Sequence, residues 1–404
     1  MKNIKKTDFV LSKKYGDLLH ITALFLFSRL IIIAGFIYGT RYLKLYNKFK
    51  YPLLRYDSFF YSSIASAGYR IYNNGKYSTV VFFPFYPLLT HFLSVVFKLS
   101  VPLSMELISN VFGYLSVIFF YKLALFYLDE KKAAKSTFLF LLFPMSIYLT
   151  AAYARPVLIF FAILTFYMFK KGRIFWGAVF SGISTSVHPT GIAVSAGAAV
   201  FLCSSFFSQS KIFSNKIPLK YVIKKTLIFS LYGLISISGI LLYIFYLSLF
   251  FHSPIAFVKY QNNIGYLGKM SFETQIIRAI TLFPFFSAHR VFDLRLNELQ
   301  FILFAVMVII SIKKKLLDAG LNFFMLILIL IIYFEHIVRI NYFGAAPRLV
   351  YLAFPAFYVI ETLISDYISK NKDAIYYEII VFSVFAVMLF YFSALFYRNY
   401  WIDF

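Results

Sequence analysis

The residue of this sequence best suited to chemistry is an aspartate set among aromatic residues. Asp57 lies in the segment RYDSFFYSSIASAGY (residues 55–69), shortly after the first long apolar run, and the Pro-rich segment FFPFYPLL (residues 82–89) follows it. A carboxylate at the point where a chain leaves a membrane can take the proton of a hydroxyl group at the water boundary. This placement favours an enzyme that acts on a lipid-linked substrate over a purely structural loop.

The composition is that of an integral membrane protein. Of the 404 residues, 61% are hydrophobic and 14% are charged, with a mean hydropathy of +0.78, whereas soluble domains carry roughly 25% charged residues. The net charge of +24 does not indicate nucleic-acid binding, because the lysines stand in short clusters between apolar runs, where membrane orientation explains them. The single cysteine, Cys203, excludes a disulfide framework and a cysteine-based metal site.

The elements that must position Asp57 are membrane-spanning helices, each of about 20 apolar residues. We expect an all-α polytopic bundle of about eleven such helices in a single domain over residues 1–404, the first of them an uncleaved anchor. The expected spans are residues 18–39, 105–128, 136–150, 154–169, 174–187, 190–207, 226–250, 299–312, 321–336, 349–364 and 375–397.

The positive-inside rule tests this count. With the amino terminus inside, all six cation clusters fall on the cytoplasmic side: residues 2–14, 131–135, 170–173, 211–225, 313–315 and 370–372. The condition is that residues 82–99 do not cross but form a re-entrant or interfacial helix on the outer side. The prolines at the start of this segment favour that arrangement, because they interrupt a regular helix start.

Two extracytoplasmic loops are then long, residues 40–81 and 251–298, and long loops in compact folds are usually functional. In the first loop we expect a short amphipathic surface helix over about residues 58–67, with its aromatic side chains toward lipid. Under this topology the unusual polar residues gather at the outer face, where ionisable groups at membrane depth are costly and tend to be functional. They are Asp57, Tyr153, Arg155, His188, Gln261, His289, Arg290, Arg339 and Arg348.

Six short motifs, in order along the chain, resemble those of the PIG-V type of GPI mannosyltransferase, including its prokaryotic relatives, within the GT-C class of membrane glycosyltransferases. The first is Tyr-Asp followed by Tyr, Ile-Ala and Gly-Tyr (residues 56–69), and the second is Phe-Phe-Pro with a further proline three residues on (residues 82–87). The others are FPMSIYLTAAYARPVLIFF (residues 143–161), SVHPTG (186–191), SPIAFVKYQ (253–261) and APRLVYLAFPAF (346–357). No single motif is specific, but their order is.

The resemblance implies transfer of a hexose, most simply mannose, from a polyprenyl or dolichyl phosphate to a lipid-linked or other extracytoplasmic acceptor. It implies that Asp57 is the catalytic base. Because no second flanking carboxylate is evident, direct displacement with inversion is the simpler hypothesis. Arg348 or Arg290 would hold the lipid phosphate, since the arginine fork suits phosphate oxygens. The expected substrate-binding set is Arg55, Tyr56, Tyr61, Tyr153, Arg155, His188, Gln261, Arg290 and Arg348.

Two positions depart from the family pattern. Arg155 stands where the family has a glutamate, and His188 stands where the family has an arginine. The charge has changed sign at the first position and has become titratable at the second. These departures leave open whether the donor and acceptor contacts, and the activity itself, are preserved.

Each candidate also has a simpler interpretation. Asp57 could cap the helix that starts at Ser58, Arg348 and Arg155 could anchor helix ends in the headgroup layer, and His188 could satisfy carbonyls at a helix end. Gln261 could be an ordinary loop residue. Arg29, deep in the first span, could pair with a partner helix. The histidines at 252, 289 and 336 lack metal-ligand spacing, so we expect no tightly bound metal and no cofactor, although a loosely held divalent ion at the lipid phosphate stays open.

Two functions from other classes remain in competition. A transporter or flippase of a lipid-linked glycan should place paired ionisable residues or broken helices near the bilayer midplane. An inactive family member acting as a subunit would explain the departures at Arg155 and His188. The expected partners are a lipid-phosphate sugar, a lipid-linked or glycan acceptor and membrane lipids. The expected location is the plasma membrane of a prokaryote or the endoplasmic reticulum of a eukaryote, with the site on the outer or luminal side.

Overall fold

The computed structural model describes residues 2–43, 51, 53–71, 78–209, 219–261, 273–274, 276–277, 292–338, 346–371 and 375–397. Within these ranges the chain is helical, without a strand and with one isolated bridge between Ile71 and Ser78. The α-helices are α1 (Lys2–Leu43), α2 (Ser58–Ala67), α3 (Phe85–Val96), α4 (Val101–Ala124), α5 (Glu130–Leu142), α6 (Arg155–Lys170), α7 (Ile174–Val187), α8 (Gly191–Gln209), α9 (Leu219–Ser236), α10 (Ser238–Phe251), α11 (Ala256–Gln261), α14 (Phe292–Lys314), α15 (Ala319–Val338), α16 (Ala346–Val350), α17 (Ala356–Lys370) and α18 (Ile375–Tyr397). Two 3₁₀ helices, η1 (Thr79–Val81) and η2 (Pro144–Leu149), complete the set.

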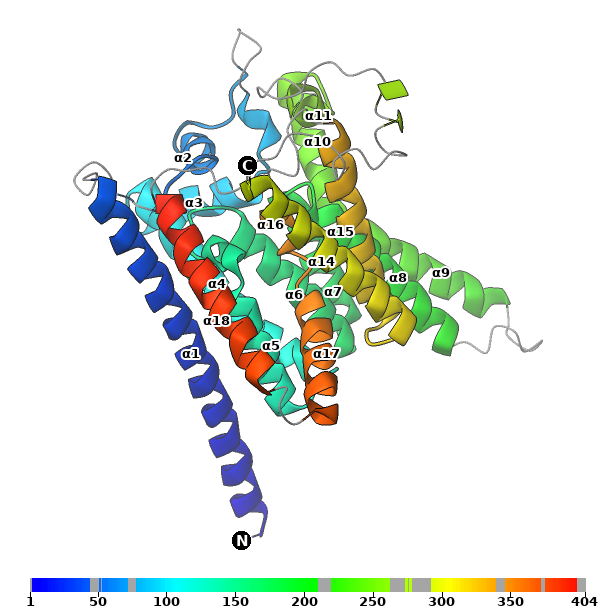
Figure 1. Cartoon of the computed structure of the whole chain (residues 1–404). Helices are drawn as coiled ribbons and strands as arrows, with labels where there is room; N and C mark the ends of the chain where they lie inside the picture. The colour runs from blue at the N-terminus through cyan, green and yellow to red at the C-terminus, as the bar shows by residue number, and fades with distance from the viewer. Residues whose placement is uncertain are drawn as a thin grey trace.

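The helices form one bundle, shown in Figure 1, in which α2 lies at the end opposite to the amino-terminal end of α1. The first and last long helices, α1 and α18, run side by side along one flank. Glycines allow this close approach: a β-carbon on Gly35 or Gly39 would stand 2.5 Å from the carbonyl oxygen of Phe390 or Ala394, respectively. Small residues at helix crossings are the usual means of close packing in membranes.

Three described helices are long and apolar enough to cross a membrane: Gly16–Arg41 within α1, α4 and α18. A fourth results if α9 and α10 count as one broken span. Shorter apolar helices, including α3, α7, α8 and most of α15, make up much of the remaining bundle. An all-helical membrane fold is therefore confirmed, whereas the count of about eleven spans and their orientation stay predictions.

The expected span over residues 226–250 is not one straight helix. The chain breaks at Ile237, where α9 and α10 meet at 58°. Hydroxyl groups stabilise the break: Ser195 and Ser181 donate to the carbonyl oxygen of Ser236 at 2.6 and 3.3 Å, and the amide of Ile240 donates to Thr185 Oγ1 at 3.1 Å. Side-chain hydroxyl groups thus form hydrogen bonds with backbone groups that lose their helical partners at the break.

Two further expected spans also differ. Residues 136–150 do not form one helix, because α5 ends at Leu142 and the chain continues as η2 after Pro144. Residues 349–364 are divided between α16 and α17, with Pro355 preceding α17. In both places a proline removes a backbone donor from the helical ladder.

The segment over residues 82–99 contains α3, whose 12 residues extend for about 18 Å. The hydrocarbon core is about 30 Å thick, so α3 is too short to cross it as a single helix. Its length agrees with the expected re-entrant or interfacial position. A prediction of a short helix over residues 58–67 is confirmed by α2, which begins and ends at those residues.

An aromatic stack fixes the chain between α16 and α17. Phe140 lies between Phe120 and Tyr351, with ring centroids 4.5 and 4.7 Å apart and nearly parallel planes. The Tyr351 hydroxyl donates to the carbonyl oxygen of Phe140 at 2.8 Å. All three rings are fully buried. This stack holds the short helix α16, and with it Arg348, against the core of the bundle.

Candidate functional site

Asp57 directly precedes α2, but its side chain does not cap this helix. Tyr56 has a positive φ of 49°, which is uncommon for a residue with a side chain, and Asp57 follows it with helical dihedral angles. The carboxylate of Asp57 accepts no hydrogen bond from the first turn of α2. Ser58 donates instead to the carbonyl oxygen of Ala152 at 2.8 Å, which ties α2 to the segment before α6. The interpretation of Asp57 as a helix cap is therefore wrong.

The partner of Asp57 is Arg348, 291 residues later in the chain. Nη1 of Arg348 stands 3.1 Å from Oδ2 of Asp57. The Arg348 side chain is 12% exposed and that of Asp57 is 28% exposed, so the pair is largely shielded but open on one side. A charge-assisted hydrogen bond of this kind is shorter and stronger than a neutral one and fixes the direction of the carboxylate.

Arg155 and His188 lie beside this ion pair. Arg155, at the start of α6 and only 5% exposed, donates from Nη1 to the carbonyl oxygen of Arg348 at 3.4 Å. His188 ends α7, and its Nδ1 accepts the amide proton of Thr190 at 3.2 Å. Burial, reinforced by the positive charges of Arg155 and Arg348, holds the pKa of His188 well below its usual range. His188 is therefore neutral near pH 7.

Tyr61 adds an aromatic wall. It is 5% exposed, and its ring meets those of Phe82 and Tyr86 edge to face, with centroids 5.1 and 5.2 Å apart. Burial raises the pKa of Tyr61, the charge of Asp57 raises it further, and Arg155 and Arg348 lower it. The expectation that all α2 aromatics face lipid is wrong for Tyr61, because it packs inward, whereas Phe59 is 58% exposed.

The other expected site residues in this part of the chain are Arg55, Tyr153 and Tyr56, whose ring meets that of Phe396 edge to face with centroids 6.1 Å apart. Arg55 is 1% exposed and donates to the carbonyl oxygens of Leu54 and Tyr51 at 2.7 and 3.4 Å. Burial lowers its pKa, while Tyr397, Tyr56, Tyr153 and Glu106 act in the opposite direction. Tyr153 is buried against Tyr148, edge to face. These residues support the backbone of the first loop.

Glu106 is a charged residue that the sequence interpretation missed. It lies on α4, close enough to Arg55 for their charges to interact. The signal was present, because an acidic residue inside an expected span is a functional candidate by default. Arg29, in contrast, contacts another segment, as one interpretation expected: it donates to Thr150, which follows η2. Its guanidinium also lies over the ring of Phe25 at 4.6 Å.

Few of the expected site residues in and after the second long loop lie within the described residues. Gln261 ends α11, of which the structure describes the backbone at that residue but not the side chain. His289, Arg290 and Arg339 lie outside the described residues. The five side chains that the structure brings together are thus Asp57, Tyr61, Arg155, His188 and Arg348. Among the described residues, no group of three or more His, Cys, Asp or Glu side chains could hold a metal ion.

An apolar groove of about 910 Å³ adjoins this group along α2. It begins at Ile64, about two helical turns beyond Asp57, and extends between α3, α7 and the break of α9 and α10. Its few polar side chains include His91, whose Nδ1 already lies 2.8 Å from the carbonyl oxygen of Ala65. The lining residues are Ile64, Ala65, Ser66, Ala67, Gly68, Tyr69, Pro84, Phe85, Pro87, Leu88, His91, Val179, Gly182, Ile183, Ser186, Ile235, Ser238, Gly239, Leu242, Tyr243 and Tyr246.

This arrangement can perform a definite kind of chemistry. A carboxylate that can accept a proton stands beside two arginines that can bind a phosphate, and a groove suited to a hydrocarbon chain starts on the same short helix. Such a site brings together a base, an anion-binding group and a lipid-binding surface.

Comparison with solved structures identifies the fold. The oligosaccharyltransferase of Archaeoglobus fulgidus in its apo form superposes with a TM-score of 0.50 at 11% identity, over 95% of this chain and 56% of that one. The archaeal oligosaccharyltransferase AglB from Archaeoglobus fulgidus, in complex with an inhibitory peptide and a dolichol-phosphate, gives 0.52 at 13% identity, over 96% and 56%. The chain spans a little over half the length of these proteins. At such identities the likeness shows a shared GT-C fold and no more.

The sequence comparison is more specific. Residues 41–223 match the sequence model of the family described as Mannosyltransferase (PIG-V), a range that contains Asp57, Arg155 and His188 but not Arg348. No curated protein matches the chain. The apolar helices, the shared fold and the family match together support a membrane glycosyltransferase. Over residues 41–223, the resemblance to the PIG-V mannosyltransferases that the sequence motifs indicate is confirmed.

Proposed function

We propose that this protein transfers a hexose, mannose, from a polyprenyl or dolichyl phosphate to a hydroxyl group of a lipid-linked or other extracytoplasmic acceptor. The observation that carries the proposal is the ion pair of Asp57 with Arg348, which has Arg155 and His188 beside it and the apolar groove along α2. The family match over residues 41–223 supports the sugar and the reaction class.

The reaction is a single displacement at the anomeric carbon. The acceptor oxygen attacks this carbon while Asp57 accepts the hydroxyl proton, and the bond between the anomeric carbon and the phosphate oxygen breaks. The phosphate leaves with the electron pair. Because one carboxylate serves as base and none is assigned as nucleophile, the configuration at the anomeric carbon inverts. A positioned base accelerates such a step by roughly 10²- to 10⁴-fold.

Arg348 has two roles in this scheme. Without substrate it orients Asp57 through the contact of 3.1 Å. When donor binds, the same guanidinium contacts the leaving phosphate, because its planar fork matches phosphate oxygens. Arg155, which contacts the backbone of Arg348, adds a second positive charge at the phosphate. Fixed cations aimed at developing charge stabilise the transition state.

His188 keeps the site from acquiring a third cation. Its pKa is held far below the usual range, so it remains a neutral group with one nitrogen accepting the Thr190 amide proton. The family's arginine at this position is thus replaced by an uncharged side chain, while Arg155 supplies the positive charge from α6. This exchange accounts for both departures without loss of a phosphate-binding cation, and it favours an active enzyme over an inactive subunit.

The groove would hold the prenyl chain of the donor. Its wall is largely apolar, its volume is about 910 Å³, and α2 connects it directly to Asp57. A chain that lies in the groove presents its phosphate toward the amino-terminal end of α2, where the arginines are. The sugar then lies at the partly open side of the ion pair, within reach of an acceptor from the aqueous side.

The test is a transfer assay with the full chain reconstituted in liposomes. Radiolabelled polyprenyl phosphate mannose is the donor, and a lipid extract of the host membrane supplies acceptors. The wild type should move label to a new lipid product, and Asp57→Asn should not. The matched control is Asp129→Ala, at another residue that precedes a helix, which should retain transfer. Wild-type turnover by Asp57→Asn would remove Asp57 from the mechanism, and equal use of polyprenyl phosphate glucose would remove the mannose assignment.

One observation favours the second candidate, a flippase of a lipid-linked glycan. The break between α9 and α10 has the form of the discontinuous helices of transporters. At this break, however, hydroxyl groups bond Ser236 O and Ile240 N–H, and no ionisable side chain takes part in these bonds. Flux of a fluorescent lipid-linked glycan across liposomes, without change in its covalent structure, would support the flippase.

A further inference from the structure

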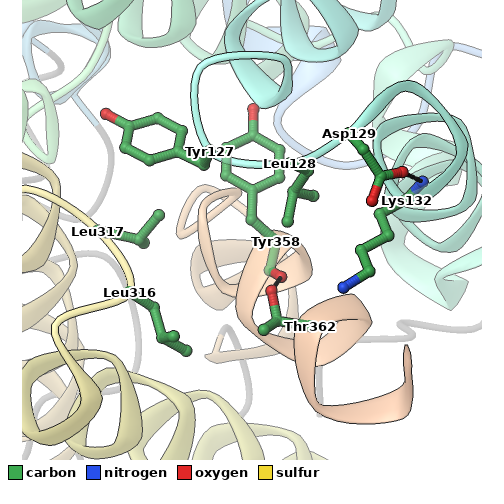
Figure 2. A pocket seen from close by; sticks show the side chains of 8 residues that line it. All are labelled: Tyr127, Leu128, Asp129, Lys132, Leu316, Leu317, Tyr358 and Thr362. Atoms are coloured by element: carbon green, nitrogen blue, oxygen red, sulfur yellow. Dashed lines mark hydrogen bonds between the residues drawn. The ribbon is translucent and has the colours of Figure 1, made fainter. Parts of the chain in front are cut away.

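A second pocket lies at the end of the bundle away from Asp57. It has a volume of about 180 Å³ and is formed where the turn between α4 and α5, the turn between α14 and α15 and one side of α17 meet. We call it the lysine pocket; its lining residues are Tyr127, Leu128, Asp129, Lys132, Leu316, Leu317, Tyr358 and Thr362. Helix α4, ~36 Å long, separates it from the Asp57 group. Figure 2 shows its side chains.

The lysine pocket is lined by aromatic, aliphatic and polar side chains, and it carries one cation, Lys132, and one carboxylate, Asp129. The rings of Tyr127 and Tyr358 stack with centroids 6.1 Å apart, and Leu316 and Leu317 face them from the other turn. In Figure 2 the amino group of Lys132 points toward Thr362. This combination of a small cavity with both apolar and polar lining and an ammonium group suits a small anion that carries a hydrocarbon portion.

The carboxylates around the pocket already have partners. Asp129 accepts the amide proton of Lys132 at 2.9 Å as the cap of α5. Asp318, outside the lining, accepts the Tyr127 hydroxyl and lies 3.4 Å from Lys170. Asp366 is 4.0 Å from the Lys132 amino group, but both side chains are at least one third exposed, so this pair is weak. Lys132 can therefore turn to a stronger anionic ligand.

The surroundings attract anions. Lys313, Lys314 and Lys315 are exposed and directly precede Leu316, and Lys131 is exposed beside Lys132. These residues belong to the cation clusters that the positive-inside rule assigns to one membrane face. Basic residues at a membrane surface contribute about 1 kcal/mol each to the binding of anionic lipids. Lys132 lines the pocket close to these clusters in the sequence, while Asp129 in the same lining already accepts the Lys132 amide proton, so Lys132 is the lining group that can hold an anion.

We propose that the lysine pocket binds the phosphate head group of an anionic phospholipid, with Lys132 on the phosphate and Thr362 near the head-group alcohol. The pocket is small, about 180 Å³, which suits a phosphate with a glycerol. The acyl chains would leave the pocket toward the lipid. This site is independent of the proposed transfer reaction.

The experiment uses the full chain purified from nanodiscs that contain equal amounts of phosphatidylglycerol and phosphatidylcholine. Native mass spectrometry counts the lipid that stays bound. Wild type should retain phosphatidylglycerol in preference to phosphatidylcholine. Lys131→Ala should lose only the general surface attraction, about fivefold, and Lys132→Ala should retain less than Lys131→Ala. Equal retention by Lys131→Ala and Lys132→Ala would overturn the proposal.

A second variant separates the pocket from the general surface charge. Thr362→Leu leaves every charge in place and narrows the cavity, so it should also lower phosphatidylglycerol retention while its melting temperature stays near that of the wild type. Unchanged retention would show that surface charge alone attracts the lipid. Glycerol phosphate in detergent tests whether the phosphate must belong to a lipid. If it raises the melting temperature of the wild type as much as phosphatidylglycerol does, the pocket binds a soluble anion and the lipid proposal is wrong.

Discussion

Asp57 and Asp129 both stand immediately before a helix, and the structure uses them in opposite ways. Asp129 has an extended backbone, with ψ of 167°, and its carboxylate caps α5 through the Lys132 amide at 2.9 Å. Asp57 has a helical backbone, with ψ of −21°, and its carboxylate leaves the helix end for Arg348. Only the first backbone geometry is that of a typical capping residue.

The difference shows that the residue type before a helix does not decide its role. Asp129 bonds within its own turn, so its contribution is local stability. Asp57 bonds to a residue 291 positions away, so its position depends on the whole bundle. A side chain held by distant elements, rather than by its own turn, is placed where several helices meet, and such a place can bind a substrate.

The largest effect is expected for Asp57→Asn. The amide retains an oxygen that can accept from Arg348 but cannot take a proton, so the transfer rate should fall by roughly 10²- to 10⁴-fold. The helix content and the melting temperature should stay near wild type, since α2 has no cap to lose. The rate is measured with saturating donor, and circular dichroism gives the fold. A collapse of α2 with loss of rate would instead make Asp57 structural.

Arg348→Lys is expected to lower kcat/KM for the donor by about 10²-fold, because a point charge replaces a fork that serves both Asp57 and the phosphate. The part of the loss that lowers kcat and kcat/KM equally reports an interaction made only in the transition state. Arg348→Ala should be at least as inactive. If only KM rises and kcat is unchanged, Arg348 binds the donor but does not stabilise the leaving phosphate in the transition state.

The third effect concerns pH. The pKa of His188 is well below its usual 6.5 in the folded protein, so between that lower pKa and 6.5 the unfolded chain binds more protons. Stability therefore decreases as pH falls below about 6.5, at a rate of up to about 1.4 kcal/mol per pH unit. His188→Asn should remove this part of the acid sensitivity. Melting temperatures of both proteins in detergent, between about pH 7 and pH 5, give the comparison; parallel curves would mean that His188 protonates freely in the fold.

The smallest effect is expected for Asp129→Ala. Loss of the cap should reduce stability by about 1 kcal/mol and lower the melting temperature by a few degrees, while the transfer rate per folded protein stays at the wild-type value. Thermal unfolding and the liposome assay measure the two quantities on one preparation. A fall in the transfer rate without a fall in stability would contradict the division of roles between the two aspartates.

Much of the fold was predictable because hydropathy acts over short stretches of sequence. The first and last spans, the helix over residues 58–67 and the limited length of α3 follow from apolar runs, small residues and prolines. The interruptions were not predictable in the same way. Residues 226–250 read as one apolar run, and the break at Ile237 depends on hydroxyl groups of Ser181, Thr185 and Ser195 in other helices.

The candidate site shows a similar division. Motif order pointed to Asp57, Arg155, His188 and Arg348 as a group, and the structure places these four near one another. Their roles stay proposals. The inward position of Tyr61 and the proximity of Glu106 to Arg55 were not anticipated, because the direction of a side chain on a short helix is set by what packs against it. The Gln261 side chain and Arg290 lie outside the described residues.

Composition, apolar run length and motif order are enough to identify a helical membrane protein with PIG-V-like motifs, because they require no knowledge of contacts. Only the tertiary structure decided that Asp57 faces Arg348 and does not cap its own helix. The physical reason is that a carboxylate chooses among the donors within its reach, and which donors come within reach is fixed by how α16 packs against the bundle core.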